Sequence, residues 1–306
     1  MRLKRLAHSL LAVLVLFGGI QLSIPSAHAD TVSIIPPKFE VFGNPGDTLT
    51  EKLKVNNSSV TEGTYQVQVE DFRAQGDDGS VDLVEDGSPR TSYSLASWIT
   101  TEPSSFTVAA GQEKVVTFTI KIPKTGEPGG HYASVLIKKA GQTAPGSASV
   151  DSRIGSLVLL RVSGNVTESL TLDSFTTDSY SQYGPVNFKL LFTNNGNVHI
   201  APTGTIVISN LFGQKVKEIP VSGANVLPGA NRLVTATWDS TNLVGRYTAT
   251  YQATYGTPKQ NLAATVSFVV FPVYLIFVVI IVIALVYLLI AKRKSLKRLI
   301  NNITSD

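Results

Sequence analysis

From residue 51 to residue 255 the chain alternates apolar and polar residues in short runs. A period of two places successive side chains on opposite faces of a strand, so these runs predict half-buried antiparallel sheets. Glycine, proline or asparagine separates the runs, as is typical of turns between strands. The clearest runs are EKLKVNN (51–57), TYQVQVEDF (64–72), EKVVTFTIKIP (113–123), HYASVLIKK (131–139), VNFKLLFTNN (186–195), TGTIVISN (203–210), RLVTATWD (232–239) and RYTATYQATY (246–255).

Both ends of the chain depart from this pattern. Residues 1–29 begin with basic residues, continue with an apolar run and close on Ala-His-Ala, which indicates a cleaved signal peptide. Residues 272–291 carry no charge, and at about 1.5 Å per residue they would cross a hydrocarbon core of about 30 Å. We therefore predict a transmembrane helix at 271–291. The stop-transfer cluster that follows, in a cytoplasmic tail at 292–306, consists of Lys292, Arg293, Lys294, Lys297 and Arg298.

These ends also explain the overall charge of the chain. Three of its 26 Lys and Arg residues fall in the signal peptide and five in the tail, whereas one of its 22 Asp and Glu residues falls in the tail. The remaining 18 basic and 21 acidic residues give the part between a net charge near −3, which does not favour a nucleic-acid partner. The prediction is a single-pass protein of the cell membrane, with its N-terminus outside.

The part between the two ends is long enough for two medium domains of about 100–200 residues each. Its strands are short, no convincing amphipathic helix interrupts them, and cysteine is absent, so no disulfide framework is available. We predict an all-β chain of two tandem immunoglobulin-like β-sandwiches followed by the membrane helix. The boundary is placed near Gly164, which gives a first sandwich at 30–164 and a second at 165–270.

Several motifs in the first predicted domain carry a family resemblance. They are VSIIPPKFEVFGNPGDTLTEKLKVNNSS, YQVQVEDFRAQGDDG and FTVAAGQEKVVTFTIKIPKTGEPGGHYASVLI, in that order. This order resembles the N-terminal, peptidoglycan-binding domain of the bacterial WxL-interacting protein family. The motifs FTNNGNVHIAPTGTIVISNLFGQKV, LPGANR and GRYTATYQATYG are similar to that family's second, partner-facing sandwich. The resemblance implies a cell-surface protein that binds peptidoglycan and a secreted or surface protein.

The residues offer little for catalysis or metal binding. After signal cleavage only His131 and His199 remain, too few for a three-histidine zinc site. The stretch NNGN (194–197) could be a phosphate or metal loop, but no helix follows it, which favours a turn. Glu70 and Asp71 are adjacent on a strand and face opposite sides, and the acidic loop 77–86 lacks the spacing of a calcium loop, which favours a solvated hairpin tip. We expect no enzyme, no cofactor and no metal.

Aromatic residues are the remaining candidates for ligand contact. Trp98 and Tyr132 would suit a glycan if they are exposed, and would be structural if they lie in the core. The same two alternatives, an exposed ligand contact or a core residue, apply to Trp238. Tyr247, Tyr251 and Tyr255 recur every four residues on one strand, so all three face one side, either as a binding stripe or as inter-sheet core.

Two functional hypotheses follow. The first is a membrane-anchored bacterial surface scaffold that engages cell-wall glycan, an envelope protein or both. The alternative is an assembly factor resembling pilus chaperones, which acts by adding a strand to a sheet edge. A free, alternating edge strand would favour strand addition, and a groove of exposed aromatic and amide side chains would favour glycan binding.

Overall fold

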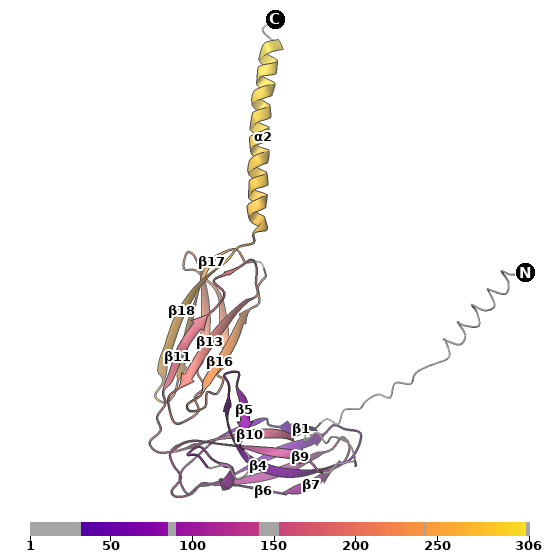
Figure 1. Cartoon of the computed structure of the whole chain (residues 1–306), viewed down its shortest axis with the longest axis vertical. Helices are drawn as coiled ribbons and strands as arrows, with labels where there is room; N and C mark the ends of the chain where they lie inside the picture. The colour runs from indigo at the N-terminus through magenta and orange to yellow at the C-terminus, as the bar shows by residue number, and fades with distance from the viewer. Residues whose placement is uncertain (1–31, 85–89, 141–152, 242, 304–306) are drawn as a thin grey trace, which may run out of the picture.

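A computed structural model describes residues 32–84, 90–140, 153–241 and 243–303 (Figure 1). The predicted signal peptide at 1–29 lies outside these residues. Two β-sandwiches follow one another along the chain and meet in an L shape, and a helix leaves the far end of the second sandwich. The predicted boundary at Gly164 falls between the last strand of the first sandwich and the first strand of the second.

The first sandwich is built from two sheets that share its opening segment, because β1 pairs with β3 in one sheet and β2 pairs with β10 in the other. The order in one sheet is β1 (Val32–Ile35), β3 (Thr48–Asn57), β8 (Glu113–Lys121) and β6 (Ile99–Glu102). The order in the other is β2 (Lys38–Gly43), β10 (Arg153–Val162), β9 (Gly129–Lys139), β4 (Gly63–Gln75) and β5 (Ser80–Leu83). In addition, β7 (Ser105–Val108) pairs with β4. A short 3-10 helix, η1 (Ala96–Trp98), precedes β6.

The second sandwich repeats this plan. Its opening segment also divides between the sheets, since β11 pairs with β13 and the two-residue β12 pairs with β18. One sheet has the order β11 (Leu170–Thr176), β13 (Val186–Asn194) and β16 (Asn231–Trp238). The other has the order β12 (Tyr180–Ser181), β18 (Gln260–Val270), β17 (Gly245–Tyr255), β14 (Thr203–Asn210) and β15 (Lys215–Val221).

Alternation along each strand fills two separate apolar cores. On β13, Phe188, Leu190 and Phe192 are all fully buried, whereas the residues between them face outward or are half-buried. On β8 of the first sandwich, Val116, Phe118 and Ile120 are buried in the same way. The prediction of an all-β chain of immunoglobulin-like sandwiches is confirmed, because period-two burial is what two facing sheets require.

The aromatic residues of the second sandwich belong to its core. Tyr247, Tyr251 and Tyr255 all point inward from β17 and are at most 9% exposed, and Trp238 is 4% exposed. The ring of Trp238 packs edge-on against Tyr247, with ring centroids 5.2 Å apart. Of the two alternatives left open by the sequence, inter-sheet packing is therefore the correct one for these four residues.

Three residues, 271–273, link the end of β18 to the helix α2 (Tyr274–Ile303). The sequence predicts a membrane span at 271–291, which coincides with the first part of this helix. Within the described part of the chain, no helix combines the length and the apolar character that a membrane crossing requires.

Candidate functional site

The junction between the two sandwiches is held by backbone hydrogen bonds. The Gly130 N–H donates to the carbonyl oxygen of Asn197 at 2.8 Å. At the other side of the junction, the tip of the β4–β5 hairpin reaches β16, where the Leu233 N–H donates to the carbonyl oxygen of Asp77 at 2.6 Å. Because the contacts come from distant points of both sandwiches, they resist both bending and twisting of one relative to the other.

Polar side chains add to this junction. Asn225 of the second sandwich donates from Nδ2 to the Glu40 carboxylate of β2 at 2.6 Å. The Lys38 ammonium and this amide lower the pKa of Glu40, so the carboxylate is charged at neutral pH. Arg161 of β10 forms an ion pair with Glu168, which lies in the link between the sandwiches.

The stretch NNGN supplies the loop of the second sandwich that meets the first. Asn194 is fully buried, and its Nδ2 donates to the carbonyl oxygens of Val198 at 2.8 Å and Val226 at 2.7 Å. Its Oδ1 accepts the N–H of Gly196 at 2.8 Å. The next strand, β14, belongs to the opposite sheet, so the stretch is a crossing between sheets stabilised by one asparagine. Among the described elements, none is a helix whose N-terminus lies next to this stretch and could bind phosphate.

Tyr132 and His199 meet across the junction. The Tyr132 hydroxyl and His199 Nδ1 are 3.4 Å apart, and the two rings pack edge-on with centroids 5.7 Å apart. Tyr132 also contacts the rings of Phe72 and Tyr93 and is only 2% exposed. Burial raises the pKa of the Tyr132 hydroxyl. Tyr132, proposed from the sequence as a candidate ligand contact, is thus a buried residue of the junction.

Trp98, the other candidate ligand contact, is half-buried at the end of η1. Its indole ring packs against His131, with ring centroids 4.4 Å apart. His131 is itself held between the carbonyl oxygens of Ser94 and Glu127, at 3.2 and 2.9 Å. The structure does not bring Trp98 and Tyr132 into direct ring contact, and glycan stacking on Trp98 stays a prediction.

The imidazole of His199 at the junction has a lower pKa than an ordinary histidine. Burial lowers the pKa of His199 to about 4, although Glu40 acts in the opposite direction. The unfolded chain binds a proton near pH 6.5, so the stability that neutral His199 contributes is present above pH 6.5 and is lost as the pH falls towards 4.

We therefore expect the free energy of unfolding to decrease between pH 7 and pH 5 by more in the natural chain than in a His199→Gln variant. Urea unfolding at the two pH values measures this difference, and acidic residues elsewhere contribute equally to both proteins. Identical pH dependence in the two proteins would mean that His199 does not control the stability of the junction.

The acidic loop forms the tip of the β4–β5 hairpin, as the sequence predicts, and also contacts the second sandwich. Asp82 forms an ion pair with Arg73 at 2.7 Å, and Asp78 holds the N–H and hydroxyl of Ser80. The tip residues 76–79 are exposed, as the sequence suggested, and the carbonyl oxygen of Asp77 at the tip also accepts the N–H of Leu233 on β16. No cluster of potential metal ligands occurs among the residues that the structure describes, and residues 85 and 86 of the loop lie outside them.

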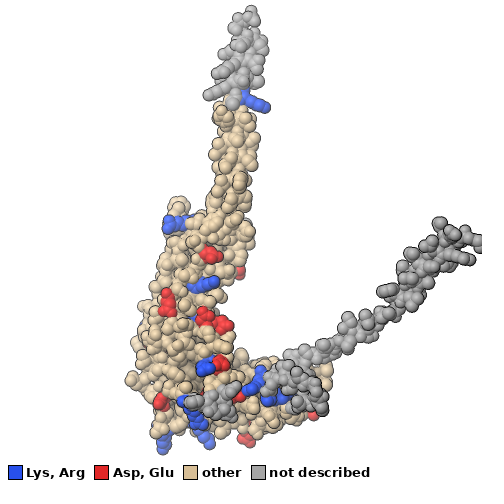
Figure 2. Space-filling view, in the orientation of Figure 1, with Lys and Arg blue, Asp and Glu red and all other residues tan. Residues whose placement is uncertain are grey.

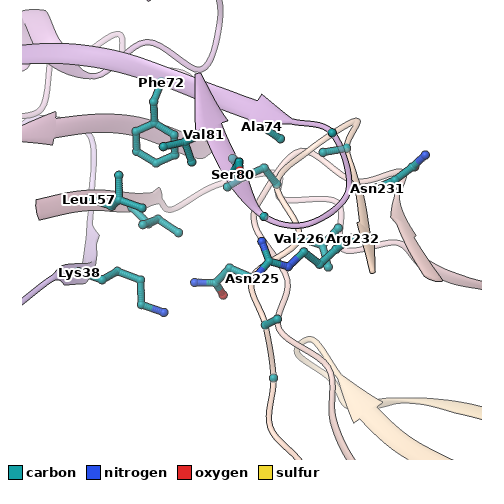
Figure 3. Close-up of a pocket in the computed structure, with 17 residues that line it drawn as sticks. Lys38, Phe72, Ala74, Ser80, Val81, Leu157, Asn225, Val226, Asn231 and Arg232 are labelled. Atoms are coloured by element: carbon teal, nitrogen blue, oxygen red, sulfur yellow. The ribbon is translucent and has the colours of Figure 1, made fainter. Parts of the chain in front are cut away.

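A cavity of about 250 Å³ lies under this hairpin at the junction (Figure 3). Its apolar lining includes Phe72, Val81 and Leu157, and the Arg232 side chain from β16 extends beneath the hairpin loop. A Cβ atom added to Gly79, which has φ of +87°, would lie 0.8 Å from Arg232 Nη1. The positive φ favours glycine at this position, whereas the end of the flexible Arg232 side chain could move to admit a Cβ atom.

The outer edge of β18 is the other notable feature of the second sandwich. β17 pairs with β18 along its whole length, from Gln260 to Val270, but on the other side β12 pairs only with Val269 and Val270. In the described chain, residues 260–268 have no strand partner on that side. This strand contains neither a charged residue nor a proline.

The orientation of the backbone on this edge follows from one hydrogen bond. The Val269 N–H points outward, since it donates to Ser179 at 2.9 Å. In a regular antiparallel strand alternate residues point the same way, and the β17–β18 register contains no bulge. Ala263, Thr265 and Ser267 therefore direct their N–H and carbonyl groups away from the sheet.

The other described edges are short or carry features that discourage pairing. β15 contains Lys215, Lys217 and Pro220, and β11 is interrupted by a bulge after Leu172. The start of β16 is already bonded to the β4–β5 hairpin. In the first sandwich, β1, β5, β6 and β7 have four residues each, and β2 has six and contains two charged residues. Among the described strands, β18 thus has the longest edge without a paired strand.

Comparison with known proteins places the first sandwich in a broad fold class. A family model described as an Fn3-like domain matches residues 41–143, about a third of the chain. No curated protein matches. The prediction of an immunoglobulin-type fold agrees with this match, whereas membership of the WxL-interacting family stays a prediction.

Solved structures give similar but distant neighbours. The class 5 fimbriae chaperone CfaA has 13% identity and a TM-score of 0.39, over 78% of this chain and 99% of that one. A chain from a chaperone–tip adhesin complex of CFA/I fimbriae has 15% identity and a TM-score of 0.40, over 77% and 98%. A protein of unknown function from Porphyromonas gingivalis has 13% identity and a TM-score of 0.31, over 76% and 98%. Such low identities and TM-scores say nothing about the function of this chain.

Proposed function

We propose that this chain is a surface scaffold that binds an extended segment of a partner protein as an added strand on β18. The observation that carries the proposal is the neutral, proline-free edge at residues 260–268. An added strand would gain backbone hydrogen bonds from Ala263, Thr265 and Ser267. The half-buried side chains of Leu262, Ala264 and Val266 offer it apolar contacts on the inner side.

The shape of the molecule supports a scaffold. Because the junction is fixed by contacts on several sides, the first sandwich holds a constant position relative to β18. Strand addition was the alternative hypothesis drawn from the sequence. The proposal places the edge in the second sandwich, since the first sandwich has only short or charged edges. Peptidoglycan binding by residues 30–164, implied by the resemblance, stays a prediction.

We further propose that the chain is attached to a membrane through residues 272–291. The support is the uncharged sequence and the exposure of the apolar side chains along α2, which face outward on all sides from Tyr274 to Ile290. Figure 2 shows this uncharged stretch between the second sandwich and the basic residues that follow. A label at Ile283 should be quenched by spin-labelled lipid when the full chain is mixed with vesicles.

Strand addition can be tested by hydrogen exchange. Peptides that bind the full chain are first selected from a display library and tested for an extended bound form. We expect such a peptide to slow amide exchange at Ala263, Thr265 and Ser267, because these groups become hydrogen-bonded. Amides of Ala264 and Val266 face β17 and serve as internal controls. Protection elsewhere on the chain, with unchanged exchange at the three outward amides, would reject the proposal.

A further inference from the structure

The end of the second sandwich from which α2 departs carries a group of exposed apolar side chains. Tyr183, Leu211, Phe212 and Val244 are 64, 69, 83 and 52% exposed, and Tyr180 is 49% exposed. We call these five residues the apolar rim. Isolated exposed apolar residues are common on protein surfaces, whereas a group on one end indicates an interaction surface.

Strand pairing places the rim residues at the same end. Tyr180 on β12 pairs with Val269, and its hydroxyl donates to the carbonyl oxygen of Phe271 at 2.9 Å. Gly245, next to Val244, pairs with Val270, the last residue before the connection to α2. At the end of β14, Asn210 pairs with Tyr247, so the β14–β15 turn projects from this end as well.

The β14–β15 turn is built to present its two apolar residues. Asn210 accepts the N–H groups of Phe212 and Gln214 on its Oδ1, both at 3.0 Å. Gly213 has φ of +78°, and its N–H donates to the Asn210 carbonyl oxygen at 3.0 Å. These bonds fix the turn while the side chains of Leu211 and Phe212 remain in solvent. A turn whose only role was to reverse the chain would need no apolar residues there.

The connection to α2 identifies the surface that would cover the rim. Only residues 271–273 separate β18 from α2, and three residues span at most about 10 Å. If α2 enters a bilayer, the rim therefore lies at the level of the lipid headgroups. Tyrosine is enriched at this level, because its ring is apolar and its hydroxyl is polar. Charges of both signs lie nearby, Arg246 and Lys215 as well as Asp178 and Asp239, so apolar contact is the main attraction.

We propose that the apolar rim is a lipid-contacting surface, in which Leu211 and Phe212 insert into the headgroup boundary and fix the orientation of both sandwiches on the membrane. This inference rests on the membrane attachment proposed for residues 272–291. It goes beyond that attachment, because a single helix alone would leave the sandwiches free to tilt.

The absence of cysteine allows single labels to be placed without background. We would introduce Gln214→Cys at the rim, Ile283→Cys in α2 and Val60→Cys, an exposed apolar position of the first sandwich. Each full-length variant carries a fluorescent label and is incorporated into phosphatidylcholine vesicles that contain lipid spin-labelled near the headgroup, lipid spin-labelled deep in the acyl chain, or no spin label. Because position 283 lies near the middle of the proposed span, we expect quenching at 214 by the headgroup label, quenching at 283 by the acyl-chain label, and none at 60 by either. A Leu211→Ser, Phe212→Ser double substitution should abolish quenching at 214 and leave that at 283 unchanged.

The label at 283 separates the two proposals. Quenching at 283 with none at 214 would overturn the lipid-contacting rim and leave the membrane attachment intact. No quenching at either position would reject the attachment, and the rim proposal with it. A shift in the emission of the 214 label without lipid quenching would indicate that a second copy of the chain covers the rim, which also overturns the proposal.

Discussion

Replacing Thr265 by proline should weaken binding of a selected peptide to β18 by about ten- to a hundredfold. The proline removes one outward N–H and leaves a carbonyl group of the added strand without a donor, at a cost of about 1–3 kcal/mol. The bonds from β18 to β17 are retained, because the N–H of Thr265 does not point toward β17. Titration of the full-length variant with the labelled peptide measures the change in Kd.

Thr265→Val is the matched control. Valine keeps the backbone N–H and the β propensity, and removes only the hydroxyl that approaches Thr250 at 3.3 Å. Its Kd should stay within about twofold of the natural chain, since the hydroxyl lies on the face of the sheet. An unchanged urea midpoint for the proline variant shows that the sandwich is intact. If both variants bind the peptide as tightly as the natural chain, the peptide does not bind through this edge.

The period of two in the sequence was sufficient to predict both sandwiches. It places Phe188, Leu190 and Phe192 on one face of a strand, and all three lie in the core. The same alternation does not indicate which strand lies at the edge of a sheet. The neutral run at residues 260–268 is visible in the sequence, but its exposure depends on β12 being only two residues long. That length is decided by tertiary packing.

The junction could not be predicted for a related reason. His199, Asn225 and Glu40 are ordinary polar residues of loops and strands, and no local motif links them. They come together because the β4–β5 hairpin docks on β16 and fixes the second sandwich against the first. Gly79 at the hairpin tip has φ of +87°, which favours glycine, but nothing in the sequence links it to Arg232. The sequence left Tyr132 open between an exposed ligand contact and a core residue, and its position at the junction buries it.

Both sandwiches use one buried asparagine to support a crossing loop. In the first, Asn57 donates from Nδ2 to the carbonyl oxygens of Thr61 at 2.8 Å and Val108 at 3.0 Å. In the second, Asn194 does the same for Val198 and Val226. The sequence signals for the two are the pairs of asparagines at 56–57 and 194–195. Because the loop after Asn194 carries Asn197 and His199, we expect this asparagine to support the junction as well as the core.

An Asn194→Ala substitution should lower the free energy of unfolding of the second sandwich by about 2–4 kcal/mol. The alanine removes the amide donor of the Val198 carbonyl oxygen and the acceptor of the Gly196 N–H, and it leaves the Val226 carbonyl oxygen with only the N–H of Ile200. Each unmade bond costs about 1–3 kcal/mol. Asn195→Ala is the matched control, since Asn195 is exposed and its Nδ2 contacts only Thr171 at 3.1 Å; its cost should stay below about 0.5 kcal/mol.

The measurement follows the fluorescence of Trp238 during urea unfolding, in a Trp98→Phe background, because the chain has only these two tryptophans. Trp238 lies in the core of the second sandwich, so its signal reports on that sandwich alone. Looser attachment of the loop should also speed amide exchange at Gly130, whose N–H donates to Asn197 across the junction. Equal losses of stability in the two variants would show that the buried amide does not support the loop. If only Asn194→Ala loses stability and the amide exchange of Gly130 is unchanged, Asn194 supports the second sandwich but not the junction.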